Sequence, residues 1–542
     1  MNKGSSINKI AYLVCIISLI FIPINFDALI IPKEILLFIS ALYLLANLGL
    51  NIKILFMNPY RKFLIIALLI TLQMLIVMFK STSPFEQEFF GRTGRGLGFS
   101  TFFALLVFLL FTTLHSKISD SKLILKWLAI SGLISSIYAL MQRLGLDIVD
   151  WNSRTNGIIG TLGNPNFQSS FTAMALLPMI IYAWTRSRKY RNILVIISAL
   201  IFLITLYFTQ STQGYIGALV SILIFFLLFF WYKHRKFFYL LSASGLITGS
   251  FAVAGMLNIG PLSHFLYKVS VQSRGNFWRA AFEAANSNPL FGVGIDSFGD
   301  AFLIYRDRPK VEMTDNAHNY FLEFSATGGY PLAILYLIIV AFTFFSFLSL
   351  QKKLNRFDIH LTAIFSAWIV FILQAIISPA SIVLLTWNVL ISGYLIGTNI
   401  RFLGDKNNSE VKPSNISYKN RILASSLLLT GLLVMAPLFK SDYELKNAAD
   451  SKDALALMKS LSSYPESTVK YNTFIQELLK SGLNPQALDM ARKAIKFNSN
   501  AVSAWALVLV NPSAPLQERI QAKSEILRLD PMNTEVSNFK LD

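Results

Sequence analysis

The sequence predicts an all-α fold: a polytopic membrane helix bundle of about 12 or 13 spans with a large outer loop, followed by a soluble helical-repeat tail. The first observation is composition, because 54% of the 542 residues are hydrophobic and only 14% are charged. The second is the recurrence of apolar runs of about 20 residues, the length that crosses a bilayer as a helix. The third is a change near residue 440, after which the charges balance and the helical patterns become short.

These observations predict two domains, a membrane domain over residues 1–440 and a tail over residues 441–542. No small-residue cleavage pattern follows the first apolar run, so we expect a retained span rather than a signal peptide. The predicted spans are residues 8–25, 29–50, 62–79, 99–115, 123–143, 167–184, 192–209, 214–232, 237–258, 331–350, 359–378, 381–400 and 420–438.

The formal net charge of +19 is distributed unevenly along the chain. From Lys440 to the end there are 13 Lys and Arg against 12 Asp and Glu, so nearly all of the excess lies in the membrane domain. Basic residues gather in every second loop, which predicts that those loops face the cytoplasm. The N-terminus is then cytoplasmic, the tail lies outside the membrane, and nucleic acid is not expected as a partner. The single cysteine, Cys15, excludes an intrachain disulfide.

The loop over about residues 259–330 is the longest between spans, and loops of that length usually carry function. Its last polar stretch predicts a short helix from about Ala317 to Ala326. Thr314 or Asp315 would cap this helix, and two glycines at 328–329 would end it.

His318 would lead one face of that short helix, with Asn319 and Glu323 near enough to orient it. An imidazole at a water-membrane boundary is suited to accept a proton. A lone histidine is also often a structural residue, so both interpretations stay open at this point.

An amphipathic helix is predicted earlier in the same loop, over about residues 271–286. Within it Arg279 has Glu283 four residues later, which predicts a helix salt bridge. Arg274 has no acidic residue three or four positions away. It either extends to the membrane interface or is reserved for an external anion.

Two other outward loops combine glycines with polar residues at the mouth of a span. One loop, residues 91–96, carries Arg92 and Arg95 between glycines, and the other, residues 160–166, ends at Asn166. Each loop is typical of a solvated turn, and each is also placed where a substrate could reach it.

The tail predicts five short helices with turns that recur about every 33 residues, as in paired-helix repeats. We therefore expect two or three tetratricopeptide-like units that bind a protein partner or help to place an acceptor. The expected helices are residues 443–461, 467–481, 485–496, 500–510 and 515–529.

Motifs in three outward segments, in this order along the chain, resemble those of the O-antigen ligase and polymerase superfamily of bacterial membrane glycosyltransferases. The resemblance covers about residues 80–400. The motifs are Gly160-Thr-Leu-Gly-Asn-Pro-Asn166, Ser273-Arg-Gly-Asn-Phe-Trp278 with Pro289-Leu-Phe-Gly-Val-Gly294, and Ala317-His-Asn-Tyr-Phe-Leu-Glu323 with Gly328-Gly329.

The resemblance implies that a glycan moves from an undecaprenyl diphosphate carrier to a hydroxyl-bearing acceptor at the outer face of the bacterial cytoplasmic membrane, without metal or cofactor. It implies that His318 is the base and that Arg274 holds the diphosphate. The family often has an arginine where this chain has Gln213, so we expect Arg95 or Arg92 to supply the missing charge, because a guanidinium grips phosphate oxygens with two hydrogen bonds. The expected substrate-binding residues are Arg274, Arg95, Arg92, Asn319, Asn166, Gln213 and Glu323.

Several alternatives remain open on the sequence. A lipid or small-molecule transporter would be expected to carry ionisable groups near mid-span and to show repeated halves, and neither is evident here. Within glycan transfer, the acceptor can be a lipid, a growing polysaccharide, a cell-wall polymer or a protein. The sequence does not distinguish a ligase from a repeat-unit polymerase or a protein O-oligosaccharyltransferase.

Overall fold

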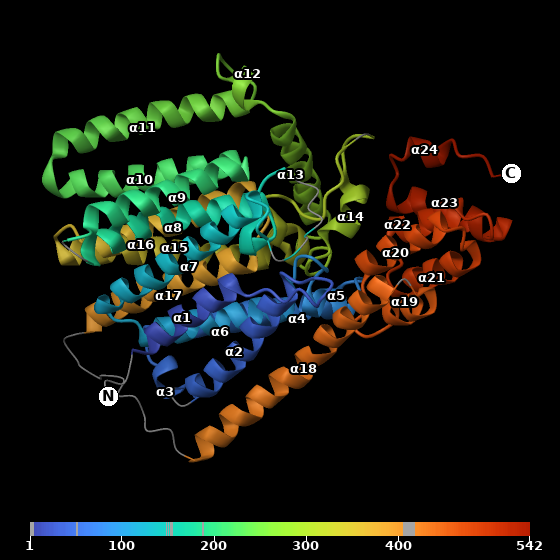
Figure 1. Ribbon diagram of the computed structural model, residues 1–542, viewed down its shortest axis with the longest axis horizontal. Coiled ribbons are helices and arrows are strands. Elements are labelled where there is room, and N and C mark those ends of the chain that lie inside the picture. The colour runs from blue at the N-terminus through green and yellow to red at the C-terminus, as the bar shows by residue number, and fades with distance from the viewer. Residues whose placement is uncertain are drawn as a thin grey trace.

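The computed structural model describes residues 5–49, 52–147, 149, 151, 156–186, 189–309, 311–404, 418–451 and 453–541. Every regular element within these ranges is helical, which confirms the predicted all-α fold (Figure 1). The apolar helices lie side by side in one bundle, and the tail packs at one end of it, next to α13 and α14 (Figure 1).

Each of the thirteen predicted spans coincides with an apolar helix in the described part of the chain. Eleven are long and apolar enough to cross a membrane, and two, α1 and α6, are shorter. The helices are α1 (Ser6–Leu19), α2 (Ile31–Gly49), α4 (Tyr60–Lys80), α6 (Phe99–His115), α7 (Ser121–Arg143), α8 (Pro165–Arg186), α9 (Arg191–Thr209), α10 (Thr212–Lys233), α11 (Arg235–Met256), α15 (Tyr320–Leu354), α16 (Ile359–Ile377), α17 (Ile382–Gly404) and α18 (Tyr418–Ser451).

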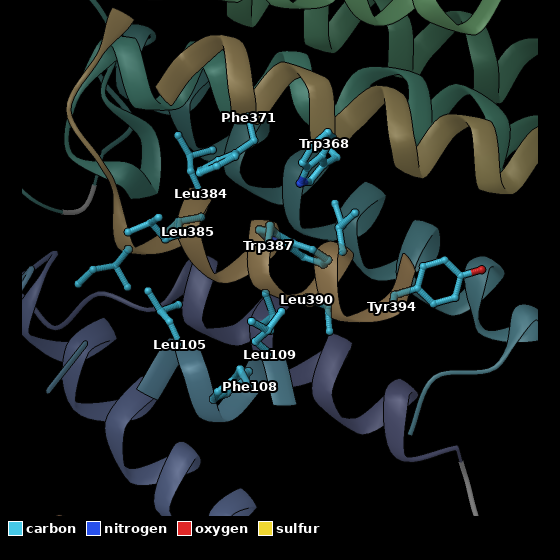
Figure 2. Close-up of a cluster of buried hydrophobic side chains, with 14 of the residues drawn as sticks. Leu105, Phe108, Leu109, Trp368, Phe371, Leu384, Leu385, Trp387, Leu390 and Tyr394 are labelled. Atoms are coloured by element: carbon cyan, nitrogen blue, oxygen red, sulfur yellow. The ribbon is translucent and has the colours of Figure 1, made fainter. Parts of the chain in front are cut away.

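The centre of the bundle is α17, which lies between α6 and α16 (Figure 2). Trp387, Leu390 and Tyr394 of α17 are fully buried. The indole Nε1 of Trp387 donates to Ser18 Oγ at 3.0 Å, so its one polar atom has a partner inside the apolar core. A helix buried on all sides in this way fixes the positions of the helices around it.

Two glycines let α17 approach α6 closely. A Cβ at Gly397 would lie 2.1 Å from the Thr113 carbonyl oxygen, and one at Gly393 would lie 2.8 Å from that of Leu109. Small residues at such crossings allow the backbone contact that drives helix association in membranes.

The long loop between α11 and α15 folds around a small core of its own. Phe277 of α13 (Val269–Ser287) packs on Phe302 of α14 (Phe298–Tyr305) at a ring-centroid distance of 5.7 Å. The short helices outside the bundle are α3 (Ile52–Leu55), α5 (Phe85–Phe90), α12 (Ser263–Leu266), η1 (Ile118–Asp120) and η2 (Gly160–Leu162).

The tail does not begin with a separate helix at residue 443. Helix α18 continues from the apolar segment through Ser451, because Lys440–Glu444 and Lys446–Asp450 pairs support it one turn apart. The prediction of a separate helix that begins at residue 443 is therefore wrong, while the division into two domains stays a prediction. The remaining tail helices are α19 (Ala454–Leu461), α20 (Thr468–Lys480), α21 (Asn484–Phe497), α22 (Val502–Val510), α23 (Leu516–Leu529) and α24 (Thr534–Ser537).

The tail docks on the same end of the bundle as the long loop. Arg306, just after α14, forms an ion pair with Asp530 of the tail at 2.6 Å, and both side chains are at least 93% buried. Thr93 Oγ1 lies 2.7 Å from Ser467 Oγ, and Val502 packs against the core of the long loop. The tail thus borders the long loop and the loop that contains Thr93. The repeat assignment itself stays a prediction.

Candidate functional site

His318 lies in a turn before α15 and not in a helix. The backbone of His318 has a φ of 51°, and α15 begins at Tyr320 with Asn319 as its N-cap. The Asn319 side chain accepts from the amides of residues 321 and 322 at 3.0 and 3.1 Å. Asn316 Oδ1 accepts from His318 N at 3.0 Å. These asparagines stabilise a turn in place of the helix predicted from Ala317, because their side chains compete for backbone amides.

The predicted end of that helix is nearly right. Gly329 has φ 75° and ψ 170°, which breaks α15 into a short outer part and a long span. A Cβ there would lie 2.5 Å from the Leu290 carbonyl, so only glycine fits this kink.

The His318 ring is held from one side and left open at one nitrogen. The ring packs on Phe277 with 5.2 Å between ring centroids. The backbone carbonyl of His318 accepts a hydrogen bond from Trp278 Nε1 at 3.4 Å. Its Nδ1 atom is buried and has no hydrogen-bond partner among the described residues. Burial and the nearby charges of Arg274 and Arg95 lower the pKa of His318 to about 4. The imidazole is therefore neutral at neutral pH and able to accept a proton.

Arg274 approaches His318 from α13. Its Nε donates to the Ile377 carbonyl and its terminal nitrogen to the Ser270 carbonyl, both at 2.8 Å. No carboxylate forms an ion pair with it in the described part of the chain. Burial lowers the pKa of Arg274, and Glu312 opposes this shift. The guanidinium is anchored to carbonyls while its charge remains uncompensated by an ion pair.

Gln213 and Asn166 lie next to this arginine through the end of α16. Ser378, the residue after Ile377, donates to Gln213 Oε1 at 2.6 Å. Ser211 donates to Asn166 Oδ1 at 2.8 Å. The structure thus brings together the beginnings of α8 and α10 and the end of α16.

Arg95 and Arg92 occupy a different environment. Arg95 lies 3.1 Å from Asp296 and 3.3 Å from Glu323, while Arg92 lies 2.7 Å from Asp300 and 3.1 Å from Asp315. We call these residues the acid-arginine cluster, which comprises Arg92, Arg95, Asp296, Asp300, Asp315 and Glu323.

The cluster contains two guanidinium groups and four carboxyl groups. Burial lowers the pKa of Arg92 and of Arg95, but the surrounding carboxylates raise each pKa more, so both shifts are upward. Burial raises the pKa of Asp296, and Arg95 opposes that shift. The cluster has no surplus positive charge for a diphosphate, so in this structure its arginines hold the loops together.

Glu323 links the cluster to His318. One carboxylate oxygen pairs with Arg95, and the other accepts from Ala317 N at 2.5 Å. This contact fixes the backbone directly before His318. Glu323 thus ties this backbone to Arg95, and its predicted part in substrate binding stays a prediction.

Sequence reasoning missed the acids that complete the cluster. Asp296 and Asp300 lie about 200 positions from their arginine partners, and no local spacing rule connects residues so far apart. The glycine-rich stretch before Asp296 was the available signal, because a tight turn there aims the following residues back at the loop of Arg92. Within the described ranges, no group of three or more His, Cys, Asp and Glu side chains could hold a metal ion.

The fold indicates a multi-pass membrane protein, and its long loop carries a site that contains a histidine and an arginine without an ion-pair partner among the described residues. Residues 197–337 match the family model for O-antigen ligase, and this range includes Gln213, Arg274, His318 and Glu323. This match covers about a quarter of the chain, agrees with the resemblance, and supports a membrane glycosyltransferase of the ligase or polymerase type. A comparison with curated protein sequences found no match.

Proposed function

We propose that the protein transfers a glycan from an undecaprenyl diphosphate carrier to an acceptor hydroxyl at the extracytoplasmic face of the bacterial inner membrane. The observation that carries the proposal is the neutral His318, whose Nδ1 is unpartnered, beside an arginine that has no ion-pair partner among the described residues. The match to the O-antigen ligase family supports this class of reaction. The tail contacts the long loop through the Arg306–Asp530 ion pair, which supports placing the tail and the long loop on the same side of the membrane.

The proposed reaction needs one base and one cation. His318 takes the proton from the acceptor hydroxyl while that oxygen attacks the anomeric carbon of the donor sugar. The bond from the anomeric carbon to the diphosphate oxygen breaks, and its electron pair leaves with the carrier diphosphate. Arg274 stabilises the charge that develops on the leaving diphosphate. The products are the glycosylated acceptor, the carrier diphosphate and a proton on His318.

Donor binding would also improve His318 as a base. The two arginines that lower its pKa are positive, and a bound diphosphate would offset their field. The pKa of His318 would then rise toward the working pH, where general bases are most effective. No metal enters this proposed mechanism, because the cationic role falls to Arg274.

The acceptor class remains open between ligation to a lipid, polymerisation of repeat units and glycosylation of a protein. The geometry around His318 applies to any acceptor hydroxyl. Analysis of surface glycans in a deletion strain separates the first two possibilities: free polymer indicates lost ligation, and single attached units indicate lost polymerisation.

The test is transfer by His318→Gln, measured with purified protein and lipid-linked donor. Glutamine keeps hydrogen bonding but cannot take the proton, so we expect a loss of roughly 100-fold to 10,000-fold. His264→Gln is the matched control, because His264 is an exposed histidine in the same loop. Near-wild-type transfer by His318→Gln would show that His318 is not the base.

A further inference from the structure

An open groove runs beside the candidate site, between α13 and α14. Its volume is about 780 Å³, within the range of roughly 300–1,000 Å³ typical of small-molecule sites. The groove combines aromatic surface with exposed charged groups. The residues that matter here are Trp278, Phe282 and Tyr305 for the aromatic surface, and Arg279, Glu283 and Asp307 for the charge.

Two polar contacts join the walls of the groove. Arg279 does not pair with Glu283, as its helix spacing predicted, but with Asp307 at 2.6 Å. Glu283 is exposed and has no ion-pair partner in the described ranges. Tyr305 Oη accepts from Asn288 Nδ2 at 2.9 Å, which ties the end of α14 to the end of α13.

The groove begins at the candidate site. Trp278 lines it and also donates to the His318 carbonyl, so one side chain borders both features. Leu322, which lines the groove from α15, lies one helical turn after the N-cap Asn319. The turn of His318 and the groove are therefore neighbours on either side of the Trp278 side chain.

Three residues of α13 form a stripe that leads away from the diphosphate position. Arg274, Trp278 and Phe282 are spaced by four residues and so share one side of the helix. Four residues rise about 6 Å along a helix, comparable to one sugar unit of an oligosaccharide. Phe282 is 54% exposed, a large apolar surface left open next to charged side chains.

We propose that this groove binds the glycan of the lipid-linked donor, with the first sugar beside Trp278 and later sugars toward Phe282. The inference rests on the proposed function, which places the diphosphate at Arg274. Sugar rings offer apolar C–H faces to the aromatic side chains and hydroxyl groups to Glu283, Asp307 and Arg279. The isoprenoid tail is unsuited to this groove, because three exposed charged groups line it.

The main test compares two donors in Phe282→Ala. Phe282 lies two helical turns beyond Arg274, so it meets the later sugars and not the first. With a donor that carries several sugars, we expect KM to rise about 5- to 10-fold, the size of one lost aromatic contact. With a single-sugar donor, KM should change less than about 2-fold. Phe282→Tyr should restore most of the loss, and Phe265→Ala, which removes an exposed aromatic from α12, is the control.

Equal KM changes for the long and short donors would overturn the proposal, as would a KM change for the acceptor alone. Failure of the groove is distinguishable from failure of the proposed function. In the first case Phe282→Ala treats both donors alike while His318→Gln remains inactive, and in the second case His318→Gln retains transfer.

A second measurement determines whether the groove is exposed to water or to lipid. Because Cys15 is the single cysteine, Phe282→Cys in a Cys15→Ser background can carry one spin label. We expect a water-soluble paramagnetic reagent to reach this label in vesicles. Preferential access by lipid-dissolved oxygen would instead identify a lipid-facing surface and contradict the proposal.

Discussion

The two arginine-bearing regions of the candidate site differ in how their charges are compensated. Arg92 and Arg95 each lie within 3.3 Å of two carboxylates, whereas Arg274 bonds to two backbone carbonyls. Sequence spacing does not separate them in this way: Arg92 has Glu88 four residues before it, whereas Arg95 and Arg274 have no acid three or four positions away. The structure separates them, because a compensated arginine serves the framework and an uncompensated one is available to an anion.

The comparison also explains why His318 belongs with Arg274. The acid-arginine cluster fixes the backbone before His318 through Glu323. The arginines of this cluster are already paired with its carboxylates, so they are not available to bind an anion. Arg274 lowers the pKa of His318 through its positive charge and forms no ion pair among the described residues. The acid-arginine cluster therefore stabilises the loops, and the region of Arg274 and His318 is the one proposed to carry the reaction.

The largest effect on stability is expected for Arg95→Ala. Its removal leaves Asp296, whose side chain is 1% exposed, without its ion-pair partner. Breaking a buried pair from one side costs about 3–5 kcal/mol, so the thermal unfolding midpoint should fall strongly. Arg279→Ala is the control, because its pair with Asp307 is exposed and worth less than about 1 kcal/mol. Equal losses in the two variants would mean that the cluster is not a framework.

A smaller effect is expected where the tail meets the cluster. Asn498 is buried and donates to Asp300 Oδ2 at 3.0 Å, the same carboxylate that holds Arg92. Asn498→Ala should cost about 1.5–3 kcal/mol, since the lost bond is to a charged group. Amide hydrogen exchange in α14, residues 298–305, should be faster in this variant, because Asp300 lies in that helix.

Asn500→Ala removes a comparable amide bond from the tail, but one that is exposed and ends on Thr82. Its effect on unfolding and on exchange should be slight. If both asparagine variants behaved alike, the tail would not be supporting the cluster.

The smallest effect is a shift in pH dependence. Since burial and two arginines lower the pKa of His318 to about 4, kcat/KM should stay constant as pH falls from 8 to about 5.5. Removing a positive neighbour in Arg274→Gln makes protonation of His318 easier and raises its pKa. The acidic loss of kcat/KM should then begin at higher pH than in the wild type. If kcat/KM fell at the same pH in Arg274→Gln as in the wild type, Arg274 would not influence the pKa of His318.

The membrane part of the fold is predictable because apolar runs of span length have few other structures available to them. The same rule fails at residue 440, where polar residues extend α18 beyond the apolar segment instead of ending it. His318 could be selected from its loop, but its conformation could not, because Asn316 and Asn319 compete with the helix for backbone amides. The acidic partners of Arg92 and Arg95 depend on long-range packing that no local pattern contains.

The most direct measurement is equilibrium binding of undecaprenyl diphosphate to Arg274→Gln and Arg95→Gln, at a temperature where both variants are folded. If Arg274 is the available cation, Arg274→Gln should weaken binding about 10- to 100-fold, the equivalent of one charge-assisted hydrogen-bonding group. Arg95→Gln should weaken it by less than about 3-fold, because its charge is already compensated by Asp296 and Glu323. The opposite order, with Arg95→Gln losing binding and Arg274→Gln retaining it, would contradict the account.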